Sequence, residues 1–160
     1  MKEDYATSNG DQIEKLYQSL LESWNKNNAS AFAKLFTEKG STVGFDGSEM
    51  IGQRQIEKEL TQIFSEHKVA SYISIVREVR QLSSAVSLLR AVAGMIPPGQ
   101  TEINPKVNVI QTLVAQKEEG EFKISIFQNT PAVFHGRPEL NSQLTNELQE
   151  AFNCQQKNSE

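Results

Sequence analysis

The first regular alternation of apolar and polar positions lies near the beginning of the chain. Between Gln12 and Asn25, apolar residues return at alternating spacings of three and one, and polar residues fill the other positions. This pattern predicts an amphipathic helix. Its apolar positions are Ile13, Leu16, Tyr17, Leu20, Leu21 and Trp24. Ser8, followed three residues later by Asp11, is a start signal of the capping-box type and places the beginning of the helix nearby.

A second, shorter helix is expected directly afterwards. The run 25–28 is rich in asparagine, which favours turns and caps, so it ends the first helix. Asn28 is placed to cap the next helix. That helix carries the apolar residues Phe32, Leu35 and Phe36.

A short strand and a third helix follow. The strand is predicted over Ser41–Phe45 and is closed by the turn signal of Asp46 and Gly47. From Gly52 onward, helical spacing returns at Ile56, Leu60, Ile63 and Phe64, and it is lost near His67.

The middle of the chain changes to a period of two, which is typical of strands. Four long segments rich in β-branched residues are predicted as strands, over 72–80, 85–96, 107–117 and 122–130. The charged, glycine-containing run 117–121 separates the last two, so we interpret these as an antiparallel hairpin.

The chain ends in another predicted helix, over 139–152, with Leu140, Leu144, Leu148 and Phe152 recurring every four residues after Pro138. The 160 residues are expected to form one domain, 1–160, with a core of about 12–138. Helices followed by long antiparallel strands indicate an α+β fold, in which N-terminal helices cover one face of a curved antiparallel sheet. Such a cone leaves a central pocket, which is the default binding site.

Composition narrows the possible partners. Sixteen basic residues against twenty acidic ones give a net charge of −4, so nucleic acid is not an expected partner. No long apolar run is present and the first ten residues are polar, which argues against a membrane partner or a signal peptide and favours the cytoplasm. The sole cysteine, Cys154, lies in a polar tail and is interpreted as incidental.

Ordered sequence motifs add a family resemblance. The segments ESWNKNNASAFAKLFTEKGSTVGFDGSEMIGQRQIEKEL, VSLLRAVAG and NVIQTLVAQKEEGEFKI, followed by FQNTP, cover about 12–138. Together they resemble the SnoaL-like, nuclear transport factor 2-like superfamily, and within it the small SgcJ/EcaC-type proteins. The resemblance implies a cystatin-like cone with a deep pocket, commonly as a homodimer. It implies no reaction, because this fold carries many functions.

One catalytic position of that superfamily is missing here. Ketosteroid-isomerase-like members carry a carboxylate two residues beyond a Thr-Val pair, and in this chain Thr42 and Val43 are followed there by Phe45. Asp46 comes one residue later, and alternation along a strand would turn its side chain away. The proton-abstracting base of that mechanism is therefore not expected.

Metal and cofactor sites are not expected either. His67 and His135 are far apart in the sequence and occur in no metal-binding spacing, so both are interpreted as surface residues. No phosphate loop or dinucleotide fingerprint is present. We therefore predict no metal and no cofactor, and whether the protein is an enzyme stays open.

Arg90 is the most informative charged residue. It lies in the apolar strand sequence LLRAV, and a guanidinium is costly to bury without partners. Two interpretations stay open. Arg90 either pairs with a strand carboxylate such as Glu78 or projects outward, or it binds an anionic oxygen of a ligand in the pocket.

The remaining candidate pocket residues are polar amides and large apolar side chains. Gln111 and Asn129 lie within strands, where their amides can bind a ligand or else the backbone. The full set of predicted ligand-binding residues is Trp24, Phe45, Met50, Arg90, Gln111 and Asn129. Arg54, a cation in the first turn of a helix, needs a partner, and we predict an ion pair with Asp46 at the pocket mouth.

Two functions follow from these expectations. The first is a small-molecule binding protein, or an enzyme, whose cavity takes a polyketide-like or other hydrophobic, carbonyl-containing molecule. The second is a non-catalytic scaffold or accessory protein with a residual cavity. A homodimer is expected in either case, because neither face of the strand over 107–117 is clearly polar, as Leu113 and Val114 illustrate. The apolar seam of the last helix, formed by Leu140, Leu144, Leu148 and Phe152, could cover the chain's own sheet or that of the partner.

Overall fold

In the computed structural model, which describes residues 8–159, helix α1 (Asn9–Asn25) begins at the predicted start signal. The Ser8 hydroxyl caps it by accepting a hydrogen bond from the Asp11 amide. Helix α2 (Ala29–Lys34) begins in the same way, with Asn28 Oδ1 accepting from the Ala31 amide. Both caps satisfy helix-end donors that would otherwise lack partners.

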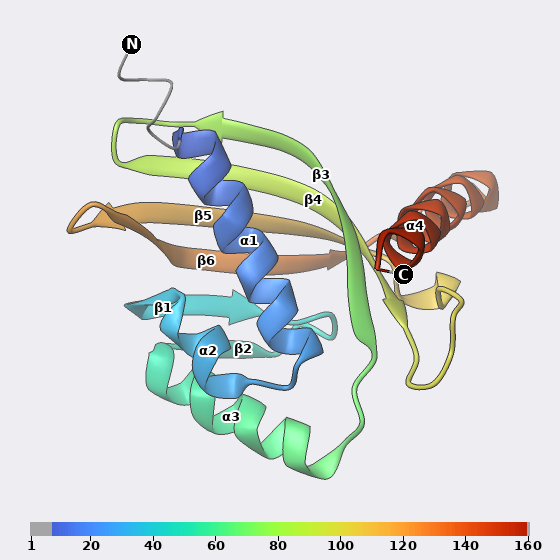
Figure 1. Ribbon diagram of the computed structural model, residues 1–160, viewed down its shortest axis with the longest axis horizontal. Coiled ribbons are helices and arrows are strands. Elements are labelled where there is room, and N and C mark those ends of the chain that lie inside the picture. The colour runs from blue at the N-terminus through green and yellow to red at the C-terminus, as the bar shows by residue number, and fades with distance from the viewer. Residues whose placement is uncertain (1–7, 160) are drawn as a thin grey trace.

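Within residues 8–159, the sheet has six strands in the order β2-β1-β6-β5-β4-β3. Their bounds are β1 (Phe36–Val43), β2 (Glu49–Ile51), β3 (Ser71–Gln81), β4 (Val86–Ile96), β5 (Val109–Glu118) and β6 (Glu121–Pro131). Strands β3 to β6 pair in antiparallel fashion, as predicted, and β5 and β6 form the predicted hairpin. Figure 1 shows the sheet curling, with α1 lying across its concave face.

Three details of the predicted sheet are wrong. Strand β1 runs parallel to β6, so the sheet is mixed, because a hydrophobic pattern carries no information on strand direction. β1 also begins at Phe36, which we had placed in the second helix. β2 was not predicted, since a strand of three residues is too short to show a period.

Gly40 explains how β1 fits beside β6. A side chain there would place its Cβ 2.5 Å from the Ile124 carbonyl oxygen, so only glycine allows this close approach. The register of β1 against β6 is irregular in the same stretch, between Phe36 and Ser41.

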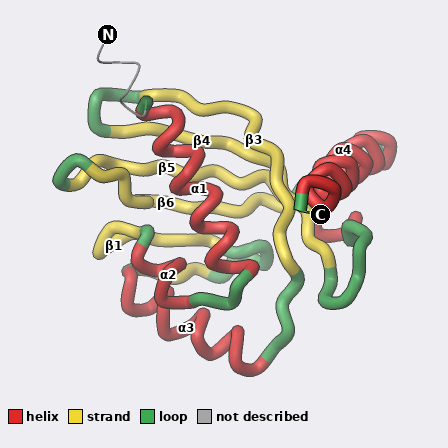
Figure 2. The backbone as a smooth tube through the Cα atoms, viewed as in Figure 1, coloured by secondary structure: helices red, strands yellow, loops and turns green. Residues whose placement is uncertain are grey.

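Helix α3 (Gln53–Glu66) follows β2, and α4 (Pro138–Asn158) follows β6 after a loop. A short 3₁₀ helix, η2 (Pro105–Val107), precedes β5. Figure 2 shows α1, α2 and α3 gathered on one side of the strands. Helix α4 lies beside β3 and β4, apart from these three helices. The structure thus has helices on both faces of the sheet.

Two hydrophobic clusters correspond to the two faces. The larger lies between the sheet and α1 to α3, and includes the fully buried Leu20, Leu89 and Leu113. The smaller joins Leu144 and Leu148 of α4 to the opposite face. The predicted C-terminal seam therefore covers the chain's own sheet.

Candidate functional site

An aromatic wall surrounds Trp24 in the last turn of α1. Its indole packs against Phe64 at 5.2 Å between ring centroids, against Tyr72 at 5.5 Å and against Phe32 at 6.4 Å. Its Nε1 donates a hydrogen bond of 2.9 Å to the Ala70 carbonyl. Because that polar atom is satisfied by the backbone, Trp24 presents an apolar surface to its surroundings.

A cavity of about 310 Å³ opens beside this wall, between α1 to α3 and the sheet. It is lined by Leu21, Trp24, Phe32, Thr42, Gly44, Phe45, Asp46, Ser48, Met50, Leu60, Ile63, Tyr72, Met95, Phe127 and Asn129. Four of the predicted ligand-binding residues, Trp24, Phe45, Met50 and Asn129, thus lie at one cavity.

The turn between β1 and β2 forms one edge of this cavity. Asp46 accepts hydrogen bonds from the Ser48 amide at 2.9 Å and from the Ser48 hydroxyl at 3.0 Å. These bonds favour the ionised form, so the pKa of the Asp46 carboxyl is below its usual value. The turn therefore holds a fixed negative charge beside the cavity.

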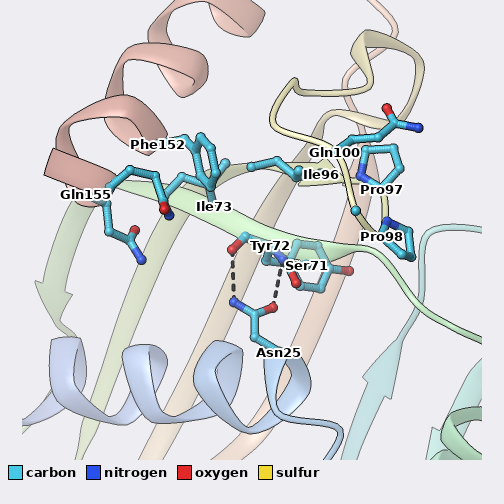
Figure 3. Close-up of a pocket in the computed structure, with 12 residues that line it drawn as sticks. Asn25, Ser71, Tyr72, Ile73, Ile96, Pro97, Pro98, Gln100, Phe152 and Gln155 are labelled. Carbon is cyan, nitrogen blue, oxygen red and sulfur yellow. Dashed lines mark hydrogen bonds between the residues drawn. The ribbon is translucent and has the colours of Figure 1, made fainter. Parts of the chain in front are cut away.

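Tyr72 lies at the start of β3, where its backbone is held by α1. The Asn25 side chain accepts from the Tyr72 amide at 2.8 Å and donates to its carbonyl at 3.1 Å, as Figure 3 shows. Burial raises the pKa of the Tyr72 hydroxyl to about 12. The hydroxyl is neutral near pH 7, as in an ordinary tyrosine, and is able to donate a hydrogen bond.

Asn129 connects the cavity to a chain of buried side chains. Its Nδ2 donates to the Val43 carbonyl, and its Oδ1 accepts from Gln111, both at 2.9 Å. Gln111 in turn accepts a hydrogen bond from the Tyr17 hydroxyl of α1. Gln111 is fully buried and does not line the cavity, so it positions Asn129 instead of meeting a ligand.

Arg90 lies elsewhere. Its guanidinium pairs with Glu78 at 3.0 Å, and Arg80 pairs with the same carboxylate at 2.9 Å. Its neighbours in sequence, Leu89 and Ala91, are buried in the cluster under the helices, so Arg90 faces the opposite side of the sheet. Of the two interpretations, the pairing of Arg90 with Glu78 is therefore the one that the structure shows. The role of Arg90 as a ligand anchor in the cavity is discarded.

The predicted ion pair between Asp46 and Arg54 is not formed. Both Asp46 oxygens are occupied by Ser48, two residues away, as is common for aspartate in turns. Arg54 instead lines a separate hollow at the start of α3, with Glu38 and Lys39.

Sequence reasoning missed several cavity residues, including Thr42, Ser48, Tyr72 and Met95. Tyr72 begins the predicted strand over 72–80, but alternation alone does not say which face of the strand meets the helices. In the structure Ile73 packs toward α4, and Tyr72 lies on the side of α1. Ser48 had no usable signal, because the strand after it was not predicted.

A second hollow, of about 290 Å³, lies at the end of α4. Figure 3 shows Phe152 and Gln155 of α4 on one side of it and the loop of Pro97, Pro98 and Gln100 on the other. Compared with the cavity beside Trp24, its lining is richer in polar amides.

Within residues 8–159, no group of three or more His, Cys, Asp or Glu side chains is placed to hold a metal ion. Among the helices described, none is both long enough and apolar enough to cross a membrane. Cys154 is a free, exposed thiol.

No protein-family model and no curated protein matches this chain. Among solved structures, it is similar to a domain of unknown function with a cystatin-like fold from Nostoc punctiforme. The two are 24% identical, the match covers 86% of each chain, and the TM-score is 0.75.

Two further structures are similar at lower identity. A protein of unknown function from Shewanella oneidensis, described as NTF-2 like, is 14% identical, with 75% of this chain and 97% of the other covered and a TM-score of 0.62. A ketosteroid isomerase-like protein from Erwinia carotovora is 13% identical, with 79% and 98% covered and a TM-score of 0.65. These similarities show that the chain has the cystatin-like fold, which agrees with the resemblance found in its sequence.

Proposed function

We propose that this protein binds a small, mainly hydrophobic, carbonyl-containing molecule in the cavity beside Trp24. The observation that carries the proposal is the composition of that cavity. Aromatic and other apolar side chains dominate its lining, and a few residues with polar side chains interrupt it: Thr42, Asp46, Ser48, Tyr72 and Asn129. Its 310 Å³ is at the lower end of the range for ligand pockets, which is roughly 300–1,000 Å³.

The polar groups suit a ligand carbonyl. The neutral Tyr72 hydroxyl is a donor, and the second hydrogen on Asn129 Nδ2 is free of the bond to Val43. Asn129 is held in place by Gln111, so little side-chain entropy is lost when it binds a ligand.

Binding fits this cavity better than acid–base catalysis. Asp46 is made less basic by Ser48, and burial makes Tyr72 less acidic. A general acid or base works best when its pKa is near the working pH, and these two groups are moved away from it. The cavity residues therefore favour a binding protein.

Fluorescence of Trp24, the only tryptophan in the chain, provides the test. Titration with 4-phenylbutan-2-one, a small aromatic ketone, should give a saturable change and raise the melting temperature by mass action. A Tyr72→Phe variant should bind the ketone more weakly, since it lacks the hydroxyl donor. Absence of saturable binding by this ketone and by a library of similar hydrophobic carbonyl compounds would contradict the proposal.

We also propose that the protein is a homodimer formed through the outer face of the sheet. Leu88, Val114 and Ile126 lie side by side on β4, β5 and β6. Ile126 is 44% exposed, and α4 packs at the other end of this face, around Val92 and Ile96. A two-fold contact between two such faces would remove these side chains from water.

A further inference from the structure

The formal charge on the described lining of the cavity beside Trp24 is negative only. Among the described residues that line it, Asp46 is the only one with a formal charge. The Asp46 carboxylate is held in place by two hydrogen bonds from Ser48. A ligand in this cavity therefore meets one carboxylate and no cationic side chain.

Neither Arg90 nor Arg54, the two cations singled out in the sequence, lines this cavity. Arg90 pairs with Glu78 on the opposite face of the sheet. Arg54 and Lys39 line the hollow at the start of α3, which shares no residue with this cavity. An anionic ligand would thus lose part of its hydration without gaining a cationic partner, which is costly.

The aromatic lining of the cavity also favours a positive over a negative group. The faces of Trp, Tyr and Phe rings carry negative electrostatic potential and attract cations. Trp24, Tyr72 and Phe45 line the same cavity as Asp46, and Phe45 is its neighbour in sequence. Rings and carboxylate together favour a positive group near the turn between β1 and β2.

We infer that the cavity selects a hydrophobic organic cation, whose apolar part lies against Trp24 and Phe127 and whose ammonium group lies beside Asp46. This inference rests on the proposed function, because it concerns the same cavity, and it adds the charge of the ligand. A carbonyl-containing molecule that also carries an amine satisfies both proposals.

Three probes of nearly the same shape separate charge from hydrophobicity. These are 3-phenylpropylamine, 3-phenylpropan-1-ol and 3-phenylpropanoate, which are cationic, neutral and anionic at pH 7. Calorimetric titration should give a dissociation constant for the amine roughly tenfold lower than for the alcohol, from one exposed ion pair and ring contacts. The carboxylate should bind at least tenfold more weakly than the alcohol, because the cavity offers it no counter-charge.

Asp46→Asn tests the assigned group directly. The asparagine oxygen can still accept from Ser48, so the turn is expected to keep its shape, and the melting temperature checks this. In the variant, the advantage of the amine should fall to about threefold or less, with binding of the alcohol unchanged. Glu57→Gln removes an exposed charge from the outer side of α3 and should leave the advantage intact.

The outcomes distinguish the two proposals. If the alcohol binds as tightly as the amine, or if the amine keeps its tenfold advantage in Asp46→Asn, the inference is overturned and the binding function stands. If none of the three probes binds at millimolar concentration and the ketone also fails, both are overturned.

Discussion

The side-chain amide of Gln111 donates a hydrogen bond of 2.9 Å to Oδ1 of Asn129, directly across the ladder between β5 and β6. Both residues are buried, and Gln111 also accepts a hydrogen bond from the Tyr17 hydroxyl. Helix α1 is thereby joined through Gln111 to a residue that lines the cavity. The buried polar side chains of Tyr17 and Gln111 thus help to position Asn129 at the candidate site.

Replacing Gln111 with leucine should cost both stability and binding. The change leaves the Tyr17 hydroxyl without its acceptor and Asn129 without its donor, so we expect a loss of about 1–3 kcal/mol in the free energy of unfolding. Urea denaturation measures this loss. In the double variant Tyr17→Phe/Gln111→Leu the loss should be smaller than the sum of the two single losses. Strict additivity would show that the two side chains are not coupled.

The buried tyrosines predict a loss of stability at high pH. Burial raises the pKa of Tyr17 and that of Tyr72, the latter from 10.0 to about 12. Because the folded protein keeps these protons more tightly than the unfolded chain, their contribution is complete below pH 10 and is lost as the pH rises through 12. The free energy of unfolding should fall by about 2 kcal/mol over this range from Tyr72 alone.

Urea denaturation at pH 8 to 12 checks this prediction, with Tyr17→Phe/Tyr72→Phe as the reference. The difference between wild type and reference should shrink as the pH rises. A constant difference would mean that the two hydroxyls titrate alike in the folded and unfolded states.

Phe45 offers a way to separate binding from folding. It is 39% exposed and lies at the cavity, so Phe45→Ala should weaken binding of 4-phenylbutan-2-one roughly tenfold with little change in stability. Ile51→Ala is the matched control, because Ile51 is 57% exposed and does not line the cavity. Equal binding by both variants would place the ligand elsewhere.

Much of the fold could be predicted from its sequence. The helical spacing around Leu16 and Leu20 and the alternation in β3 to β6 report burial on one side, which is what a hydrophobic pattern records. Strand direction leaves no such trace, and the parallel pairing of β1 with β6 was missed.

Arg90 shows why the site was harder to predict. Val92 is covered by α4 on one face of β4, and Leu89 and Ala91 are covered by the helices on the other, so both faces of this strand look apolar in sequence. Arg90 lies on the same face as Val92 but is paired with Glu78. Its position depends on how far α4 extends over the sheet, which only tertiary structure determines.

The proposed homodimer gives a prediction about the outer face of the sheet. A lysine at Ile126 would place a charge among Leu88 and Val114, so Ile126→Lys should convert a dimer to a monomer at micromolar concentration. Light scattering measures the mass, and Leu82→Lys, at an exposed position outside the paired strands, is the control. A wild-type mass equal to one chain would contradict the dimer.

Methionine methyl signals test the central claim most directly, because Met50 and Met95 both line the cavity beside Trp24. In protein labelled with ¹³C at methionine methyl groups, titration with 4-phenylbutan-2-one should shift the signals of both residues along one saturable curve. Assignment by Met50→Leu and Met95→Leu identifies the two signals. If the ketone binds but neither methyl signal moves, the ligand does not occupy this cavity and the proposed site is wrong.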